Sequence, residues 1–274
     1  MIEEKKYIDI ASVIKQSDSK SLSGLPNFAV KIIERIIKQK RMNSILNKYA
    51  DLEGPDFLQA MIKEFNLNLE IEGTENLPAK TKCFFVANHP FGIIDGLVLT
   101  HIVSGKYGTL KAIGNDVFMY IPHLRPLIAQ VNVFGKNPKE TVLELDKIYH
   151  SDTPITHFPA GEVSRRYNGK VEDTEWAKSF ITKSVESHRD IVPFYFQGKN
   201  SALFNVLFLI RRFLGIKAYI ELLLLPREMF KKRNKTIRVK IGSPIPYNTF
   251  SNTMKPYDWA QNIRNQVYQM TNNI

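Results

Sequence analysis

Residues 82–96 read KCFFVANHPFGIIDG, and this stretch decides the fold. Residues 82–87 form a short apolar run, which is typical of a buried strand that is covered on both faces. Pro90 has no amide hydrogen to give to a sheet, and Gly92 allows backbone angles that other residues avoid. We therefore expect the strand to end near His89 and to leave the imidazole at the edge of a sheet.

The chain around this stretch alternates between strand and helix patterns. Further strands are expected at residues 67–71, 109–113, 128–133, 155–158, 191–196 and 237–241. Helices are expected at residues 96–103, 141–150, 173–187 and 257–271. This alternation indicates an α/β fold with a mixed, mostly parallel central sheet flanked by helices. Catalytic groups on such folds lie in loops at strand ends, where His89 is expected.

A helical preamble is expected before the first strand. Residues 28–49 repeat apolar side chains at helical spacing and carry lysines and arginines on the other side, and residues 56–65 form a second short helix. The sequence thus predicts two parts, a helical preamble at 1–65 and an α/β domain at 66–274. The preamble is a candidate for contact with a membrane surface, and the apolar stretch at residues 203–225, with paired arginines in its middle, is the other candidate.

Composition limits the class of protein. The 274 residues carry a formal net charge of +11, which favours nucleic acid, an anionic membrane surface or a phosphorylated cofactor as partner. The single cysteine, Cys83, excludes an intrachain disulfide and a cysteine-based metal site, and fits a reducing compartment. We expect no secretory signal, and no window holds the roughly 18 apolar residues of a spanning helix.

His89 and Asp95 are the first candidate catalytic residues. Asp95 is expected at the start of the next helix, where the helix dipole favours a carboxylate. A turn between the two residues would bring Asp95 onto one imidazole nitrogen and leave the other free as a base. This would be the base half of a triad without its serine, so the nucleophile would be a hydroxyl of the substrate. The alternative is a structural histidine and a helix cap.

A second block, residues 158–166, reads FPAGEVSRR. A strand-ending turn followed by Arg165 and Arg166 is a credible site for an anion. The alternative is a solvated loop with surface arginines.

Together the two blocks resemble those of the PlsC-type lysophospholipid acyltransferases. Residues 88–96 are similar to the His-x4-Asp block of that family, in the variant with five intervening residues found in the haemolysin-like, lyso-aminolipid O-acyltransferase branch. The resemblance implies that His89 deprotonates the acceptor hydroxyl, which attacks an acyl thioester, and that Asp95 orients His89. It also implies that a wider set of residues binds the substrates: Asn88, Gly92, Arg125, Gly161, Glu162, Ser164 and Arg165.

The second block departs from the Phe-Pro-Glu-Gly-Thr-Arg-Ser pattern of the family. Ala160 replaces the glutamate, and Glu162 follows Gly161. This form is similar to the haemolysin-like branch and implies a lyso-aminolipid acceptor rather than lysophosphatidic acid. Residues 120–126 and 133–136 resemble a block tied to acceptor binding, with Arg125 and Lys136 as candidates. Residues 191–196 resemble a strand that shapes the acyl pocket.

The resemblance also implies partners and a location. The acyl donor would be a thioester of coenzyme A or acyl carrier protein, with no other cofactor and no metal. The basic residues of 31–41 and 231–235 fit an anionic membrane as well as nucleic acid, but no nucleic-acid motif accompanies them. We therefore expect a peripheral protein on the cytoplasmic face of a membrane and no nucleic-acid partner. Alternatives are a non-catalytic membrane or nucleic-acid binding protein on the same scaffold, and a lipid thioesterase.

Overall fold

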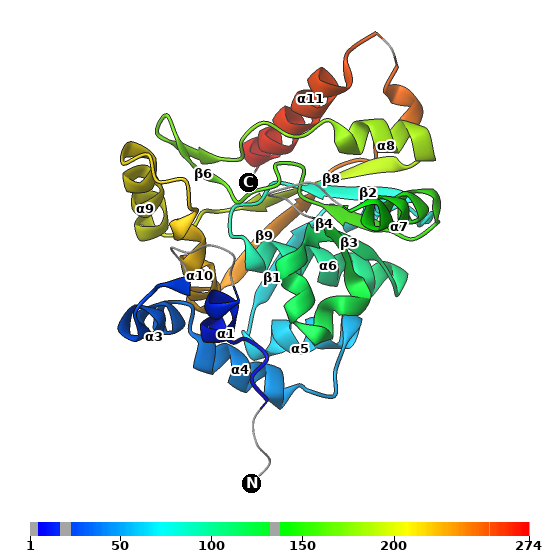
Figure 1. The fold of residues 1–274 in the computed structure, drawn as a ribbon. Coiled ribbons are helices and arrows are strands. Elements are labelled where there is room, and N and C mark those ends of the chain that lie inside the picture. Colours follow the sequence, from blue (N-terminus) through cyan, green and yellow to red (C-terminus); the bar gives the residue numbers. More distant parts are fainter. Residues whose placement is uncertain (1–4, 17–22, 132–137, 252, 274) are drawn as a thin grey trace.

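A seven-stranded sheet forms the centre of the molecule, with helices on both of its faces (Figure 1). The computed structural model describes residues 5–16, 23–131, 138–251 and 253–273. The strands of the sheet are β1 (Asn68–Glu72), β2 (Cys83–Ala87), β3 (Lys111–Asn115), β4 (Ile128–Val131), β5 (Ile155–His157), β8 (Asp190–Gln197) and β9 (Thr236–Ile241). They lie in the order β1-β9-β8-β2-β5-β3-β4. All neighbours are parallel except β8 and β9, so the predicted fold class is confirmed.

The helices match the expected alternation in most places. They are α1 (Ile10–Lys15), α3 (Asn27–Ile36), α4 (Gln39–Lys48), α5 (Gly54–Glu64), α6 (Ile93–Tyr107), α7 (Lys139–His150), α8 (Ser179–Ser187), α9 (Ala202–Phe213), α10 (Leu225–Lys231) and α11 (Pro256–Gln269). Short 3-10 turns include η2 (Asp116–Tyr120), η3 (Pro122–Leu127) and η4 (Ile220–Leu224).

Strand β2 explains why both faces of the sheet are covered. All five of its side chains are buried, so it needs apolar partners above and below. Phe85 faces the core cluster that contains α5 and α6, whereas Phe84 and Val86 face the cluster that contains α8 and α11. Phe57 and Phe65, from the expected preamble, belong to the same cluster as Phe85. The preamble and the α/β part therefore share one core cluster.

The helix expected over residues 28–49 is wrong, because two helices occupy this range. Lys38 adopts a left-handed conformation (φ 59°), which ends α3 and begins α4. The new direction aligns a row of amide side chains on α4 with the backbone of the N-terminal segment. Gln39, Asn43 and Asn47 each accept a hydrogen bond from a backbone N–H of that segment, at 2.8–2.9 Å.

The helix expected over residues 173–187 is also too long, since α8 begins only at Ser179. Asp173 lies before it in a segment without regular secondary structure, where its buried side chain accepts hydrogen bonds from His89, Ser164 and Trp176. Ahead of this segment a hairpin of β6 (Arg165–Tyr167) and β7 (Lys170–Glu172) was not expected. Its turn is Asn168-Gly169, with both residues at positive φ.

Candidate active site

The loop after β2 is fixed from both sides. The side-chain amide of Asn88 donates to the backbone oxygen of Phe196 (2.9 Å) and accepts from its N–H (2.7 Å), which ties the end of β2 to β8. The N–H of His89 donates to Asp173 Oδ1 (3.1 Å), and its carbonyl accepts from the N–H of Ser164 (2.9 Å). The backbone position of His89 is therefore set by three separate segments of the chain.

The contact expected between His89 and Asp95 is present. His89 Nδ1 lies 3.0 Å from Asp95 Oδ2, and the carboxylate is fully buried. Asp95 is the third residue of α6, not its first, and its Oδ2 accepts the N–H groups of Phe91 (2.7 Å) and Gly92 (2.9 Å). Those bonds cap the helix and hold the carboxylate where it meets the imidazole. Nε2 is the ring nitrogen left available for other chemistry.

Gly92 is required for this turn. Its φ of +84° is a conformation that L side chains rarely adopt. A Cβ there would lie 2.9 Å from the Leu225 side chain and 3.3 Å from that of Val163. The backbone of the first block is thus pressed against α10 and against the second block.

The second block lies beside the first because β2 and β5 are adjacent parallel strands. Val86 pairs with His157, so the two following loops leave the same edge of the sheet. The Phe158 ring stacks on the His89 imidazole, with ring centroids 4.0 Å apart and an interplanar angle of 25°. Phe158 therefore covers one face of the imidazole and restricts its rotation.

Asp173 joins the two blocks and was missed by the sequence analysis. It is buried, and its Oδ1 accepts from the His89 N–H and from the Ser164 hydroxyl (2.5 Å). Its Oδ2 accepts from Trp176 Nε1 (2.9 Å). Burial raises the pKa of Asp173, and the hydrogen bonds oppose that rise. No local pattern marks this residue, because the partner that brings it to the site, His89, is 84 residues away in the sequence.

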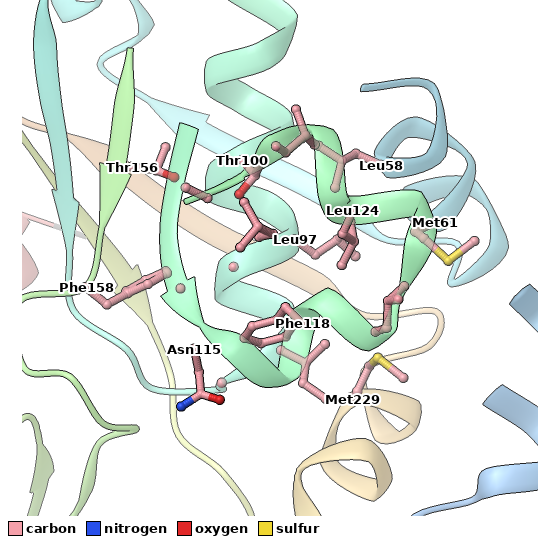
Figure 2. Close-up of a pocket in the computed structure, with 18 of the residues that line it drawn as sticks. Leu58, Met61, Leu97, Thr100, Asn115, Phe118, Leu124, Thr156, Phe158 and Met229 are labelled. Carbon is pink, nitrogen blue, oxygen red and sulfur yellow. The ribbon is translucent and has the colours of Figure 1, made fainter. Parts of the chain in front are cut away.

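A cavity of about 270 Å³ opens beside His89 (Figure 2). Its walls come from α4, α5, α6, β3, η2 and η3, and they are largely apolar; Figure 2 shows Leu58, Met61, Leu97, Phe118, Leu124 and Met229 among the lining side chains. His89, Gly92 and Gly161 also line it. The space suits an apolar chain whose reactive end reaches the imidazole.

His157 also lines the cavity. Burial lowers its pKa from 6.5 to about 4, so its imidazole is neutral at pH 7. The cavity wall therefore gains no charge from this histidine, which fits an apolar occupant.

Arg165 lies deeper than the sequence suggested. It is 1% exposed and is not among the residues that line the cavity. Its Nε donates to Glu221 Oε1 (3.0 Å) and its Nη1 to Glu162 Oε2 (2.6 Å), while Glu221 Oε2 lies 2.8 Å from Arg211 Nε. We call these four residues the ion chain. It connects the second block to α9 and η4.

The other expected substrate-binding residues fall into two groups. The side chains of Asn88 and Ser164 are buried and bonded to protein groups, so a direct contact with substrate would first require those bonds to break. Arg125 is exposed on η3, where its Nε donates to the carbonyl of Met119 (2.7 Å). Lys136 lies outside the described residues.

Two expectations about other segments can be compared with the described residues. Residues 191–196 are a buried central part of β8, and none of them lines the cavity. Among the described residues, no group of three His, Cys, Asp or Glu side chains is placed to hold a metal ion. In that same part of the chain, no helix is long and apolar enough to cross a membrane.

Comparisons with known proteins place the chain in a family. The family model described as Acyltransferase matches residues 13–274, and the chain belongs to this acyltransferase family. The predicted relationship to PlsC-type acyltransferases is confirmed, and the protein is an enzyme of this class.

Individual relatives are similar over nearly the whole chain. A lyso-glycine lipid O-acyltransferase of Phocaeicola vulgatus is 40% identical over 264 residues, which cover 96% of this chain and 95% of that protein. A protein of the same name from Bacteroides thetaiotaomicron is 38% identical over 264 residues, covering 96% and 97%. The solved structure of the 1-acyl-sn-glycerophosphate acyltransferase PlsC from Thermotoga maritima has 15% identity and a TM-score of 0.47, covering 90% of each chain.

Proposed function

We propose that this enzyme is an O-acyltransferase that moves a fatty acyl chain from a thioester to the hydroxyl of a lyso-aminolipid in membrane lipid synthesis. The observation that carries the proposal is the His89–Asp95 contact beside a largely apolar cavity. The names of the two relatives, with nearly full coverage of both chains, favour a lyso-glycine lipid as the acceptor.

The proposed chemistry uses His89 as a general base. Nδ1 faces Asp95, which keeps its proton on that side and leaves Nε2 to take the proton of the acceptor hydroxyl. The hydroxyl oxygen then attacks the thioester carbonyl carbon. When the carbon–sulfur bond breaks, the thiolate takes the proton back from the imidazolium. The products are an ester and a free thiol, and His89 is regenerated.

The cavity and the exposed charged residues would bind different parts of the substrates. We propose that the acyl chain lies among the apolar walls and that Gly92 and Gly161 let it approach His89 closely. Glu162 and Arg125 are the charged members of the expected set that solvent reaches, and we propose that they meet the acceptor head group. A glycine head group would offer a carboxylate to an arginine such as Arg125.

The donor would be coenzyme A or acyl carrier protein thioester. The net charge of +11 would attract either the phosphates of coenzyme A or the acidic surface of a carrier protein. We further propose that the enzyme acts peripherally at the cytoplasmic face of an anionic membrane, where its lipid acceptor is found.

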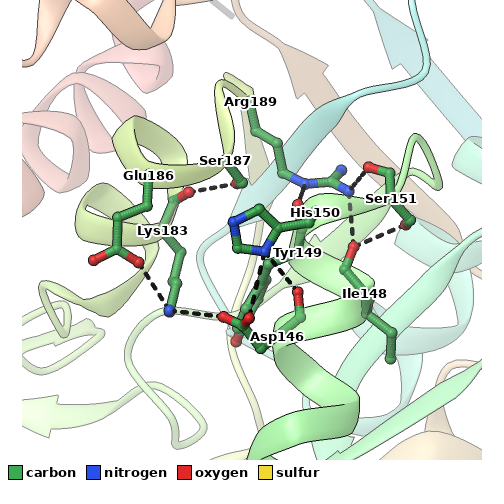
Figure 3. A network of polar contacts seen from close by, with 9 residues as sticks. All are labelled: Asp146, Ile148, Tyr149, His150, Ser151, Lys183, Glu186, Ser187 and Arg189. Atoms are coloured by element: carbon green, nitrogen blue, oxygen red, sulfur yellow. Dashed lines mark hydrogen bonds and ion pairs between the residues drawn. The ribbon is translucent and has the colours of Figure 1, made fainter.

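A matched pair of histidines allows a direct test. His150 on α7 also stands beside an aspartate, with Nδ1 3.6 Å from Asp146 Oδ2, but both side chains are half exposed (Figure 3). His89→Gln and Asp95→Asn should lower acyl transfer, whereas His150→Gln should not. General base catalysis contributes about 10²- to 10⁴-fold, so the loss in His89→Gln should fall in that range.

The assay follows a labelled acyl thioester presented with lyso-glycine lipid, with lysophosphatidic acid, or with no acceptor. We expect product on lyso-glycine lipid. Full activity in His89→Gln would remove His89 from the mechanism. Release of free fatty acid without any acylated lipid would indicate a thioesterase instead.

A further inference from the structure

Helix α9 is apolar on two faces, although only one of them is buried. Phe204 and Phe208 pack into the protein. On the other face Leu203, Val206 and Ile210 are each about half exposed, with spacings that place them in one stripe. A helix that is apolar all round is normally covered on every side. The exposed stripe of α9 therefore needs a partner.

The stripe continues through Phe213, the last residue of α9, to Leu214. Phe213 is 90% exposed, and Leu214 next to it is 61% exposed. We call Leu203, Val206, Ile210, Phe213 and Leu214 the α9 apolar face. Large apolar patches on a monomer surface mark interaction sites, whereas single exposed apolar residues are ordinary.

Helix α3 adds to the same side of the molecule. Its Ile36 packs in a small core cluster with Phe204 and Leu207 of α9. Phe28 and Ile32 precede Ile36 at intervals of four residues, so they share its stripe, and both are more than half exposed. Figure 1 shows α3 and α9 on one side of the molecule, next to α10.

The charges around the α9 apolar face indicate what covers it. Residues 199–219 contain four basic residues and no acidic one, and Arg212 and Lys217 are exposed. Lys31 and Arg35 are exposed on α3. Apolar residues bordered by lysine and arginine are typical of helices that lie in an anionic membrane surface. A second copy of the chain would instead bring positive charge against positive charge.

We propose that the α9 apolar face, flanked by α3, docks on an anionic lipid bilayer, with Phe213 and Leu214 entering the acyl region. This inference rests on the proposed function, because an enzyme with a lipid acceptor must reach a membrane. It goes further by assigning the membrane contact to a segment far from the N-terminus.

The buried side of α9 links this face to the active site. The Arg165 guanidinium lies over the Phe208 ring, 5.4 Å from its centroid, and the ion chain joins Arg211 of α9 to Arg165 through Glu221. Arg165 directly follows Ser164, whose N–H bonds the carbonyl of His89. Docking through α9 would therefore fix the orientation of the second block, and of His89, relative to the lipid surface.

The test replaces two residues of the face and one control. Phe213→Asp/Leu214→Asp puts charge on the α9 apolar face, and Leu143→Asp does the same on α7, where Leu143 is 64% exposed. The assay is co-sedimentation with phosphatidylcholine vesicles with and without phosphatidylglycerol. The double variant should lose at least ten-fold in binding to the anionic vesicles, and Leu143→Asp should bind as the wild type does.

Two results would overturn the inference. One is wild-type binding of the double variant to anionic vesicles. The other is a wild-type dimer that the double variant abolishes while vesicle binding is unchanged, which would assign the face to a second copy.

Acyl transfer in detergent micelles separates this inference from the proposed function. Micelles deliver the acceptor without a bilayer, so the double variant should keep its activity there and lose it only on vesicles. Equal loss in micelles and on vesicles would count against docking as the role of the face. Absence of transfer by the wild type in every format would refute the proposed function, whereas sedimentation would still decide the docking.

Discussion

The ion chain offers a sharp test of whether Arg165 supports the active site or contacts the acceptor. Arg165 and Glu221 are 1% and 0% exposed and bond each other at 3.0 Å. The variants are Arg165→Met, Glu221→Leu and the double variant, each of which replaces a charged side chain with an apolar one of similar length. Removal of Arg165 alone leaves the fully buried Glu221 with Arg211 as its cation. Removal of both takes that buried anion away and leaves the better solvated Arg211 and Glu162 without their partners.

The expected magnitudes follow from burial. Breaking a fully buried ion pair by deleting one partner costs about 3–5 kcal/mol, whereas replacing both partners by apolar residues is often nearly neutral. Arg165→Met should be the more severe single change, because Glu221 would keep only Arg211. At roughly 2–4 °C per kcal/mol for a chain of about this size, its melting temperature should fall by about 10 °C. The double variant should recover part of that loss, because Arg211, which is 11% exposed, still lacks its counter-charge.

The assays are thermal unfolding and the KM for the acceptor lipid. If Arg165 acts by positioning the second block, the double variant should regain stability and keep a KM within about three-fold of the wild type. If the arginine binds the acceptor head group directly, the double variant should be stable yet show a KM raised ten-fold or more. Additive losses of stability in the double variant would refute the argument, because independent residues do not form a coupled pair.

Three further outcomes are expected. Asp173→Ala removes the carboxylate that accepts hydrogen bonds from the His89 N–H and the Ser164 hydroxyl. The kcat should therefore fall about 10- to 100-fold, with little change in the KM for the acyl donor. An unchanged kcat would show that Asp173 does not position His89. The pKa of His157 is about 4 in the folded protein and 6.5 in the unfolded chain, so the free energy of unfolding should fall as pH drops from 6.5 to 4, by about 3 kcal/mol at pH 4. Urea unfolding of His157→Asn should lack this dependence on pH. An equal dependence in the variant would contradict the lowered pKa of His157. Cys83 is fully buried with its pKa raised to about 11, so a maleimide should label it in urea but not in the native protein, and rapid native labelling would show an accessible thiol.

The sequence predicted the sheet well because buried strands carry a local signal. The apolar run of β2 and the proline and glycine after it located both the strand and the turn that presents His89. The two blocks, about 70 residues apart, were linked by their resemblance to a family, and the structure brings them together because β2 and β5 are adjacent parallel strands. Strand bounds were correct to within two residues wherever the structure describes them.

The errors arose where tertiary contacts override local pattern. No residue pattern in 28–49 predicts the left-handed conformation of Lys38. Hydrogen bonds from the backbone of the N-terminal segment to the amide side chains of α4 offset the cost of this conformation. Asp173 resembles an ordinary helix start, although it is the buried acceptor of three donors. The β6–β7 hairpin is different, because Asn168-Gly169 is a recognised turn signal that could have revealed it.

The sequence predicted where the candidate residues lie better than what they contact. His89, Asp95, Gly92 and Gly161 lie where the motif order suggested, because their backbone geometry is local. Arg165 was expected to face an anion, and it is instead enclosed in the protein by Glu221. That partner is 56 residues away and has no sequence signal.

The pairing of the first strand of the sheet with the last has a consequence for synthesis of the chain. Within the described residues β1 pairs with no strand but β9, and Asn68 pairs with Thr236. The first strand to be synthesised can therefore pair only after the last one has been made. Contacts between residues this far apart in the sequence form late in folding, because closing the long loop between them costs conformational entropy. A nascent chain that has not yet reached residue 236 therefore exposes an unpaired edge at β1 while it is still on the ribosome. Its charged residues Glu70 and Glu72, which later pair with Arg238 and Lys240, would discourage association of that edge with other chains.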